Sequence, residues 1–133
     1  MSASDYLEQE ILDHIFGKGT YAVPTIYVAL CTASIDESDD GSDITEANYT
    51  GYARKSTSAS DWSRTDSVME NANAITFDEC TAGSSTVSHV ALVDAQTTGT
   101  GNVLFYAQLT SNLSVSDGIE PYFAAGDIQV TAS

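Results

Sequence analysis

Basic residues are the scarcest feature of this 133-residue chain. Lys and Arg number four against 19 Asp and Glu, which gives a formal net charge of −15 at pH 7. Nucleic-acid binding depends on clustered Lys and Arg that displace counterions from phosphates, and anionic membranes attract basic segments in a similar way. The composition therefore argues against DNA, RNA and membranes as partners. It indicates either a highly solvated surface or one that docks onto a basic protein.

Cysteine, histidine and long apolar runs are also rare. Cys31 and Cys80 lie outside any CxxC or Cys/His pattern, so we expect two buried thiols, while a disulfide between them stays open. The sequence contains no run of 18 apolar residues, so no membrane-spanning helix is predicted. The acidic N-terminal stretch does not resemble a signal peptide. With only His14 and His89 present, little material exists for acid–base or metal chemistry.

Short runs of β-branched and aromatic residues, by contrast, recur along the chain, and residues 86–95 are the best candidate for a central strand. Side-chain alternation with period 2 predicts one face made of Val87, His89, Ala91 and Val93. The other face would carry Ser88, Val90, Leu92 and Asp94. Because both faces contain apolar residues, we expect this strand to be covered on both sides.

Further strands are predicted at 25–32, 52–58, around Trp62, and at 71–77, 103–109, 112–116, 119–124 and 128–131. Turn signals separate them at short intervals, which is typical of a sandwich. The predicted fold is mainly β: a β-sandwich or jelly-roll-like domain with one N-terminal α-helix. We expect a single domain over 1–133, with the helical segment in 1–17 and the sandwich in 18–133.

The N-terminal helix is predicted at residues 5–16, and Gly17 supplies a C-terminal stop. Leu7, Ile11 and Ile15 recur at i, i+4 and i+8, and Leu12 and Phe16 widen this apolar stripe. The stripe must pack on the chain's own sandwich or on a neighbouring subunit, and the sequence leaves both open.

Two adjacent basic residues, Arg54 and Lys55, fall in the predicted strand 52–58, where alternation would send them to opposite faces. At least one of them is therefore expected to pair with a carboxylate or to face a partner. The candidate partner-binding residues are Leu7, Ile11, Ile15, Arg54 and Lys55.

The acidic loop 35–46 is the one cluster with a metal-like composition. Its spacing departs from the EF-hand pattern by one residue, and flanking helices are not predicted. A solvated loop is favoured, and no metal or cofactor is expected. A looser calcium site would draw on Asp36, Asp40, Asp43 and Glu46.

Catalytic arrangements are not favoured either. Ser88, His89 and Asp94 could suggest a triad, but neighbouring strand residues should point to opposite faces, and no GxSxG elbow precedes a serine. Acidic pairs are abundant without any sign of a cleft, as expected in so acidic a chain. No catalytic residue is predicted, and we expect a protein that is not an enzyme.

An ordered series of motifs carries a resemblance over nearly the whole chain: 11–17 (ILDHIFG), 24–32 (PTIYVALCT), 51–54 (GYAR), 86–95 (TVSHVALVDA) and 125–127 (AGD). In these motifs the chain resembles a family of small virion proteins of tailed phages, which are labelled either as tail fibre proteins or as capsid-associated proteins. The resemblance implies an N-terminal helix followed by a β domain, and it implies no catalytic residues.

For a virion protein, the acidity favours the outer capsid surface, because the inner face of a capsid meets DNA. The chain is also short for a fibre and has no fibrous repeat. These points favour a capsid cement or decoration protein, with the major capsid protein and further copies of itself as partners. The alternatives are a tail fibre or baseplate adaptor and a host-binding tail protein, in which exposed Tyr49, Tyr52 or Trp62 would contact carbohydrate.

Overall fold

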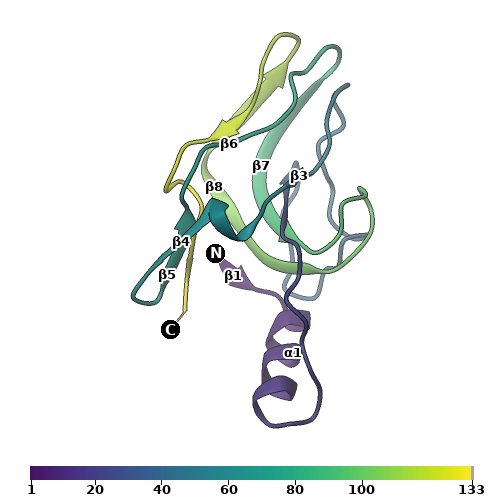
Figure 1. Ribbon diagram of the computed structural model, residues 1–133. Coiled ribbons are helices and arrows are strands. Elements are labelled where there is room, and N and C mark those ends of the chain that lie inside the picture. The colour runs from purple at the N-terminus through teal and green to yellow at the C-terminus, as the bar shows by residue number, and fades with distance from the viewer. Residues whose placement is uncertain (133) are drawn as a thin grey trace.

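The strand β7 (Ser84–Val93) lies at the centre of a five-stranded antiparallel sheet in the computed structural model, which describes residues 1–132. The order of strands in this sheet is β1-β8-β7-β2-β3 (Figure 1). Its other members are β1 (Ser2–Ala3), β2 (Tyr27–Cys31), β3 (Lys55–Ser56) and the long, curved β8 (Val103–Ser116). The predicted central position of segment 86–95 is confirmed.

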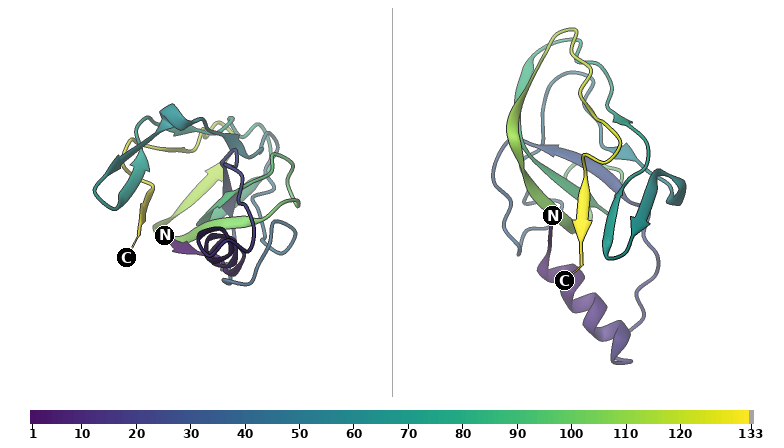
Figure 2. Two further views of the ribbon diagram at one scale, coloured as in Figure 1. Left: turned by 60° about the horizontal axis from the view of Figure 1, so that its bottom comes forward. Right: turned by 90° about the vertical axis from the view of Figure 1, so that its left-hand side faces the viewer.

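Two smaller antiparallel sheets lie across the inner face of the large one (Figure 2). One has the order β10-β5-β4, made of β4 (Trp62–Thr65), β5 (Val68–Asn71) and β10 (Gln129–Thr131), and the 3₁₀ turn η1 (Ala59–Asp61) precedes it. The other pairs β6 (Ile75–Thr76) with β9 (Tyr122–Phe123). The mainly β architecture with one N-terminal helix is confirmed, and this layering is compatible with a jelly roll.

Several element boundaries differ from those predicted. The sequence patterns missed β1 and β5, and segment 112–116 is the end of β8 rather than a separate strand. Strand β3 is reduced to two residues, so Arg54 lies just outside it. Elements this short have too few residues to show a period, and their pairing is decided by neighbours far away in the sequence.

The two faces of β7 pack in two separate apolar clusters, as expected for a strand covered on both sides. Val90 and Leu92 join the inner cluster with Leu30 and Phe77. Ala91 and Val93 join an outer cluster that is closed by two residues of the acidic loop, Ile35 and Ile44. The loop that the composition marks as solvated therefore also supplies part of the apolar cover.

An irregularity at Ser88 changes the predicted alternation of β7. Between the pairs His89–Gln108 and Val87–Leu113, β8 advances five positions while β7 moves only two. A β-bulge of this kind shifts the side-chain parity. As a result Val87 points into the inner cluster beside Val90 and Leu92, and the prediction that Val87 shares a face with Ala91 and Val93 is wrong.

The helix α1 (Asp5–Ile15) begins at Ser4, whose hydroxyl oxygen accepts a hydrogen bond from Leu7 N at 3.2 Å. Ser4 also ties this end to β8, because its N–H donates to Leu104 O at 2.9 Å and its hydroxyl donates to Val103 O. The chain leaves the helix at Gly17, where φ is +72°, a value that glycine adopts without strain. The predicted helix is confirmed.

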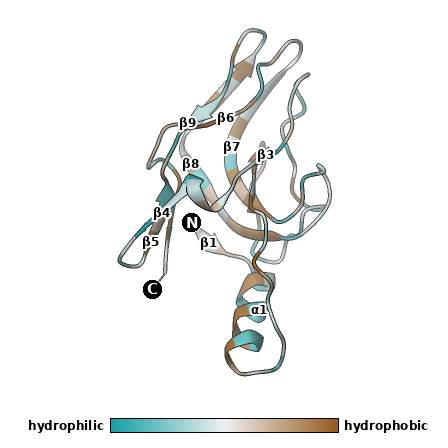
Figure 3. Ribbon diagram, viewed as in Figure 1, coloured by the Kyte–Doolittle hydropathy of each residue, from teal (hydrophilic) through white to brown (hydrophobic). Residues whose placement is uncertain are grey.

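Beyond its first turns, α1 projects away from the β body (Figure 2). Leu7 is the one buried residue of this helix. Apolar residues continue along the part of α1 that leaves the body (Figure 3). Within residues 1–132, no helix combines the length and apolar character needed to cross a membrane.

The burial pattern predicts that the same substitution, Leu to Ala, affects stability very differently at two positions. Leu30→Ala should lower the free energy of unfolding by about 2–5 kcal/mol, because Leu30 is fully buried in the inner cluster. Leu12→Ala should change it by less than about 0.5 kcal/mol, because Leu12 is 57% exposed on α1. Urea unfolding followed by circular dichroism measures both, and equal losses would contradict the assignment of the core.

Candidate functional site

Arg54 and Glu46 form a buried ion pair. Arg54 Nε lies 2.9 Å from Glu46 Oε1, Arg54 Nη2 donates to Glu46 Oε2 at 2.9 Å, and the two side chains are 0% and 3% exposed. Arg54 Nη1 donates to the carbonyls of Ala95 and Thr100, at 2.8 and 2.9 Å. The sequence prediction that one of the two basic neighbours meets a carboxylate therefore holds for Arg54.

Glu46 also receives hydrogen bonds from two other segments of the chain. The hydroxyl of Tyr52 donates to Glu46 Oε1 at 2.8 Å, and the backbone N–H of Gly99 donates to Oε2 at 3.2 Å. The pair thus joins the acidic loop, the β7–β8 connection and the segment that precedes β3. Its role is structural, because water and ligands cannot reach the charges.

The acidic loop and the β7–β8 connection meet backbone to backbone next to this ion pair. Gly41 N donates to Gly101 O at 2.8 Å, and a Cβ atom placed on Gly41 would lie 1.9 Å from Thr100 O. No side chain fits in that space, so glycine is required at position 41.

Burial beside Glu46 also sets the protonation of two neighbours. Burial, reinforced by the Glu46 charge, raises the pKa of the Cys31 thiol to about 12 and raises the pKa of Tyr52 further still. Both groups are therefore neutral at physiological pH. Cys31 and Cys80 are buried free thiols, as expected.

The carboxylates of the acidic loop are occupied by local turns rather than directed at a common centre. Asp39 Oδ2 accepts from Asp36 N at 2.8 Å, and Asp43 Oδ2 accepts from Asp40 N at 3.0 Å. The fourth calcium candidate, Glu46, is paired with Arg54. Across residues 1–132, no three His, Cys, Asp or Glu side chains are grouped so that they could hold a metal ion.

The Ser88–His89 pair lies closer than alternation predicts, and the expectation that the two side chains point to opposite faces is wrong. Ser88 Oγ is 2.8 Å from His89 Nδ1 and hydrogen-bonded to it, at the point where the β7–β8 register is irregular. Asp94 takes no part, since its carboxylate accepts two hydrogen bonds from Asn102, at 2.6 and 3.0 Å. Asp94 therefore does not orient His89 as the acid of a catalytic triad would.

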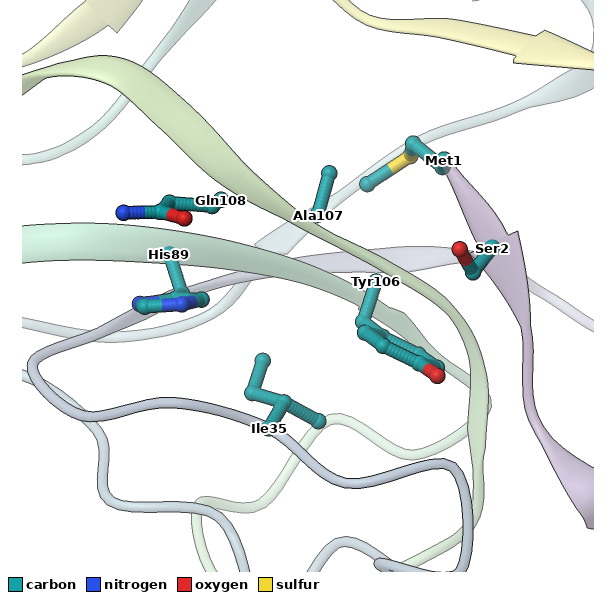
Figure 4. A pocket seen from close by; sticks show the side chains of 7 residues that line it. All are labelled: Met1, Ser2, Ile35, His89, Tyr106, Ala107 and Gln108. Carbon is teal, nitrogen blue, oxygen red and sulfur yellow. The ribbon is translucent and has the colours of Figure 1, made fainter.

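His89 borders a cavity of about 400 Å³ beside β8 and β1 (Figure 4). Ile35 and Tyr106 lie around the same space, and Met1, Ser2, Ala107 and Gln108 complete its lining. Burial and the carboxylates of Glu37 and Asp36 raise the pKa of Tyr106, so its phenol stays protonated.

The five candidate partner-binding residues separate into two groups. Leu7 and Arg54 are buried inside the fold, so their side chains are not on the surface of this chain. Lys55 is exposed at the edge of the large sheet, whereas Ile11 and Ile15 lie on the free part of α1. Together with Leu12 and Phe16, these two isoleucines form what we call the apolar helix face. The exposed fractions are 47% for Ile11, 57% for Leu12, 70% for Ile15 and 73% for Phe16.

A second apolar surface, which sequence patterns did not reveal, is a groove of about 620 Å³ on the open side of the sandwich. The loop that follows α1, the β4–β5–β10 sheet and the inner face of β7 and β8 all contribute to it. We call it the apolar groove; its main apolar residues are Val23, Ile26, Trp62, Met69, Leu92, Phe105 and Val130. These positions are distant in the sequence, so no local pattern could have predicted their meeting.

The aromatic residues considered for carbohydrate binding are largely unavailable. Tyr49 is buried, and the hydroxyl of Tyr52 is engaged with Glu46. Trp62 is half-buried in the apolar groove, and its Nε1 donates to Thr57 Oγ1 at 2.9 Å. Tyr49 and Tyr52 therefore form no exposed stacking platform with Trp62.

Comparison with known proteins gives one family. Residues 2–131 match the family model Gp80, described as podophage GP4 fiber I protein gp80. The match spans the helix and all three sheets. A search of curated proteins gave no match.

The buried ion pair predicts a large difference between two neighbouring substitutions. Arg54→Ala should lower the free energy of unfolding by about 3–5 kcal/mol, since it leaves Glu46 charged and uncompensated in the interior. Lys55→Ala, at an exposed position, should change it by less than about 0.5 kcal/mol. Guanidinium unfolding of both variants checks this, and a mild effect of Arg54→Ala would show that the pair is dispensable.

The turn at Asp40 predicts an acid titration below the usual range. Hydrogen bonds from the Ser42 hydroxyl and the Ser42 backbone N–H, at 2.6 and 2.8 Å, lower the pKa of Asp40 from its ordinary value of 3.8. Because the folded-state pKa is the lower one, Asp40 stabilises the fold above pH 3.8, and this contribution is lost as pH falls through the folded-state pKa.

Carboxyl NMR titration should show this lowered midpoint, and Ser42→Ala should move it back toward the ordinary value. Ser38→Ala, a matched change in the preceding turn, should leave the Asp40 midpoint where it is. A midpoint at or above 3.8 in the unsubstituted protein would refute the turn geometry.

Proposed function

Because the chain belongs to the family of the podophage GP4 fiber I protein gp80, we propose that it is a structural subunit of a tail fibre. Membership makes it a structural virion protein of a tailed phage. The observation that carries the finer assignment is the family description, which names a fiber protein and applies to residues 2–131.

The proposed role is attachment without catalysis. In support, Asp94 is engaged by Asn102 and does not orient the Ser88–His89 pair, and the buried charges of Arg54 and Glu46 neutralise each other inside the fold. The exposed features are an acidic exterior, the apolar helix face and the apolar groove. Surfaces of this kind bind other proteins.

The partners proposed for this subunit are other virion proteins and further copies of itself. A formal net charge of −15 favours a partner with basic residues around its docking surface and disfavours direct contact with DNA or with an anionic membrane.

A second candidate is a capsid cement or decoration protein bound to the major capsid protein. The observation that favours it is the same acidity, which suits the outer surface of a head better than the DNA-facing interior. The chain also has no fibrous repeat along its 133 residues. In this role many copies would each add a modest interface and together stabilise the shell.

Locating the protein on purified phage particles distinguishes the two functions. Gold-labelled antibodies raised against the purified chain should mark the tail region in electron micrographs. The same antibodies, first absorbed with purified protein, provide the control.

Label on the head would overturn the fibre assignment and favour the cement role, for which particles lacking the protein should lose resistance to heat. Particles without label, together with absence of the chain from their protein content, would overturn both.

A further inference from the structure

The distal part of α1 ends in an apolar surface that the chain itself does not cover. Ile11, Leu12, Ile15 and Phe16 occupy adjacent positions on two successive turns, so their side chains gather on one side of the helix. Anchoring at Ser4 and Leu7 fixes the other end of α1 against β8 and holds this face away from the body (Figure 2). The face therefore needs cover from a second molecule.

The apolar groove is a surface of matching character on the same chain. An apolar cavity of about 150 Å³ accommodates one benzene ring, so a groove of about 620 Å³ has room for several side chains of the size of Phe and Ile. Met69 and Val23 at its border are 37% and 96% exposed, which leaves the groove accessible from solvent. The chain's own α1 is tied to β8 by Ser4 and points away from the body.

Charge decides which molecule fits. Acids adjoin this face on α1: Asp5 and Glu8 lie on the same side of the helix one to two turns earlier, and Asp13 flanks the face, whereas Glu10 lies on the opposite side. The groove carries Arg64, whose guanidinium donates to the backbone carbonyl of Asp66 at 2.6 Å and has no carboxylate partner within residues 1–132. In a chain with only four Lys and Arg, an unpaired arginine beside an apolar groove is complementary to an apolar helix with acidic edges.

We propose that the apolar helix face of one copy docks in the apolar groove of a second copy, with Arg64 facing the acids of the incoming helix. Each copy offers one face and one groove, so the contact links like subunits through two different surfaces. This inference deepens the proposed function and rests on its proposal that further copies of the chain are partners, but it is tested on the purified chain alone. It can therefore fail while the virion location stands, and the reverse is also true.

Light scattering on the purified, full-length chain over a range of concentrations tests the contact. The unsubstituted chain should show a mass above its 14.0 kDa monomer that falls on dilution. The face variant Ile15→Ser/Phe16→Ser should associate about 30-fold or more weakly, because it removes two anchors without changing charge. Tyr122→Ser, a matched change at a 62% exposed aromatic outside the groove, should associate normally.

A mixing experiment identifies the groove as the other half of the contact. The groove variant Met69→Asp should by itself associate as weakly as the face variant. A mixture of the two should recover association, because the first supplies an intact face and the second an intact groove.

Arg64→Glu, at an exposed position that tolerates substitution, should weaken association roughly 2- to 10-fold. It provides a groove test that does not depend on Met69→Asp folding. A monomeric unsubstituted chain at every concentration, unchanged association in the face variant or in Arg64→Glu, or no recovery on mixing two folded variants would each overturn the proposal.

Discussion

The buried pairing of Arg54 with Glu46 is the interaction on which the outer half of this fold depends. Water is excluded from both charges, and their remaining hydrogen-bonding atoms meet carbonyls, the Tyr52 hydroxyl and a backbone N–H, so little of the attraction is screened. This network holds the acidic loop against the β7–β8 connection. The loop can then cover the outer face of the central strands, and its Glu37 carbonyl receives the Asp5 N–H at the start of α1.

The position of α1 follows from that arrangement. The helix is fastened where it begins, by Ser4 on β8 and by burial of Leu7. Its last turn meets only the loop that follows it, where Tyr21 N donates to His14 Nδ1 at 3.2 Å, and its apolar residues stay exposed. The apolar helix face is therefore exposed because α1 packs on the β body only through its first turns. A second apolar surface opens on the other side of the sandwich, between sheets whose edges do not close completely. The apolar helix face and the apolar groove are thus both on the exterior, where another molecule can contact them.

The distribution of charge also favours interaction through a few specific surfaces. One of the four Lys and Arg side chains is used inside the fold, and the remaining exterior is overwhelmingly acidic. Such a surface keeps copies apart except where apolar contact and a local cation outweigh repulsion, which favours specific assembly over indiscriminate aggregation. For a structural virion protein, selective attachment is the property that matters.

The sequence by itself determined the charge balance, the mainly β class, the extent of α1 and the central position of 86–95. Each of these follows from the composition or from a local period, such as the spacing of Leu7, Ile11 and Ile15 between Ser4 and Gly17. Only the tertiary structure decided that the irregular β7–β8 register beside Ser88 leaves Val87 on the inner face and that Ser88 contacts His89. It also decided that Arg54 selects Glu46 among 19 acids, and that distant segments meet in an apolar groove. The physical reason is that strand register, ion-pair choice and surface shape depend on contacts between residues far apart in the chain, where a shift of one position reverses which side chains are buried.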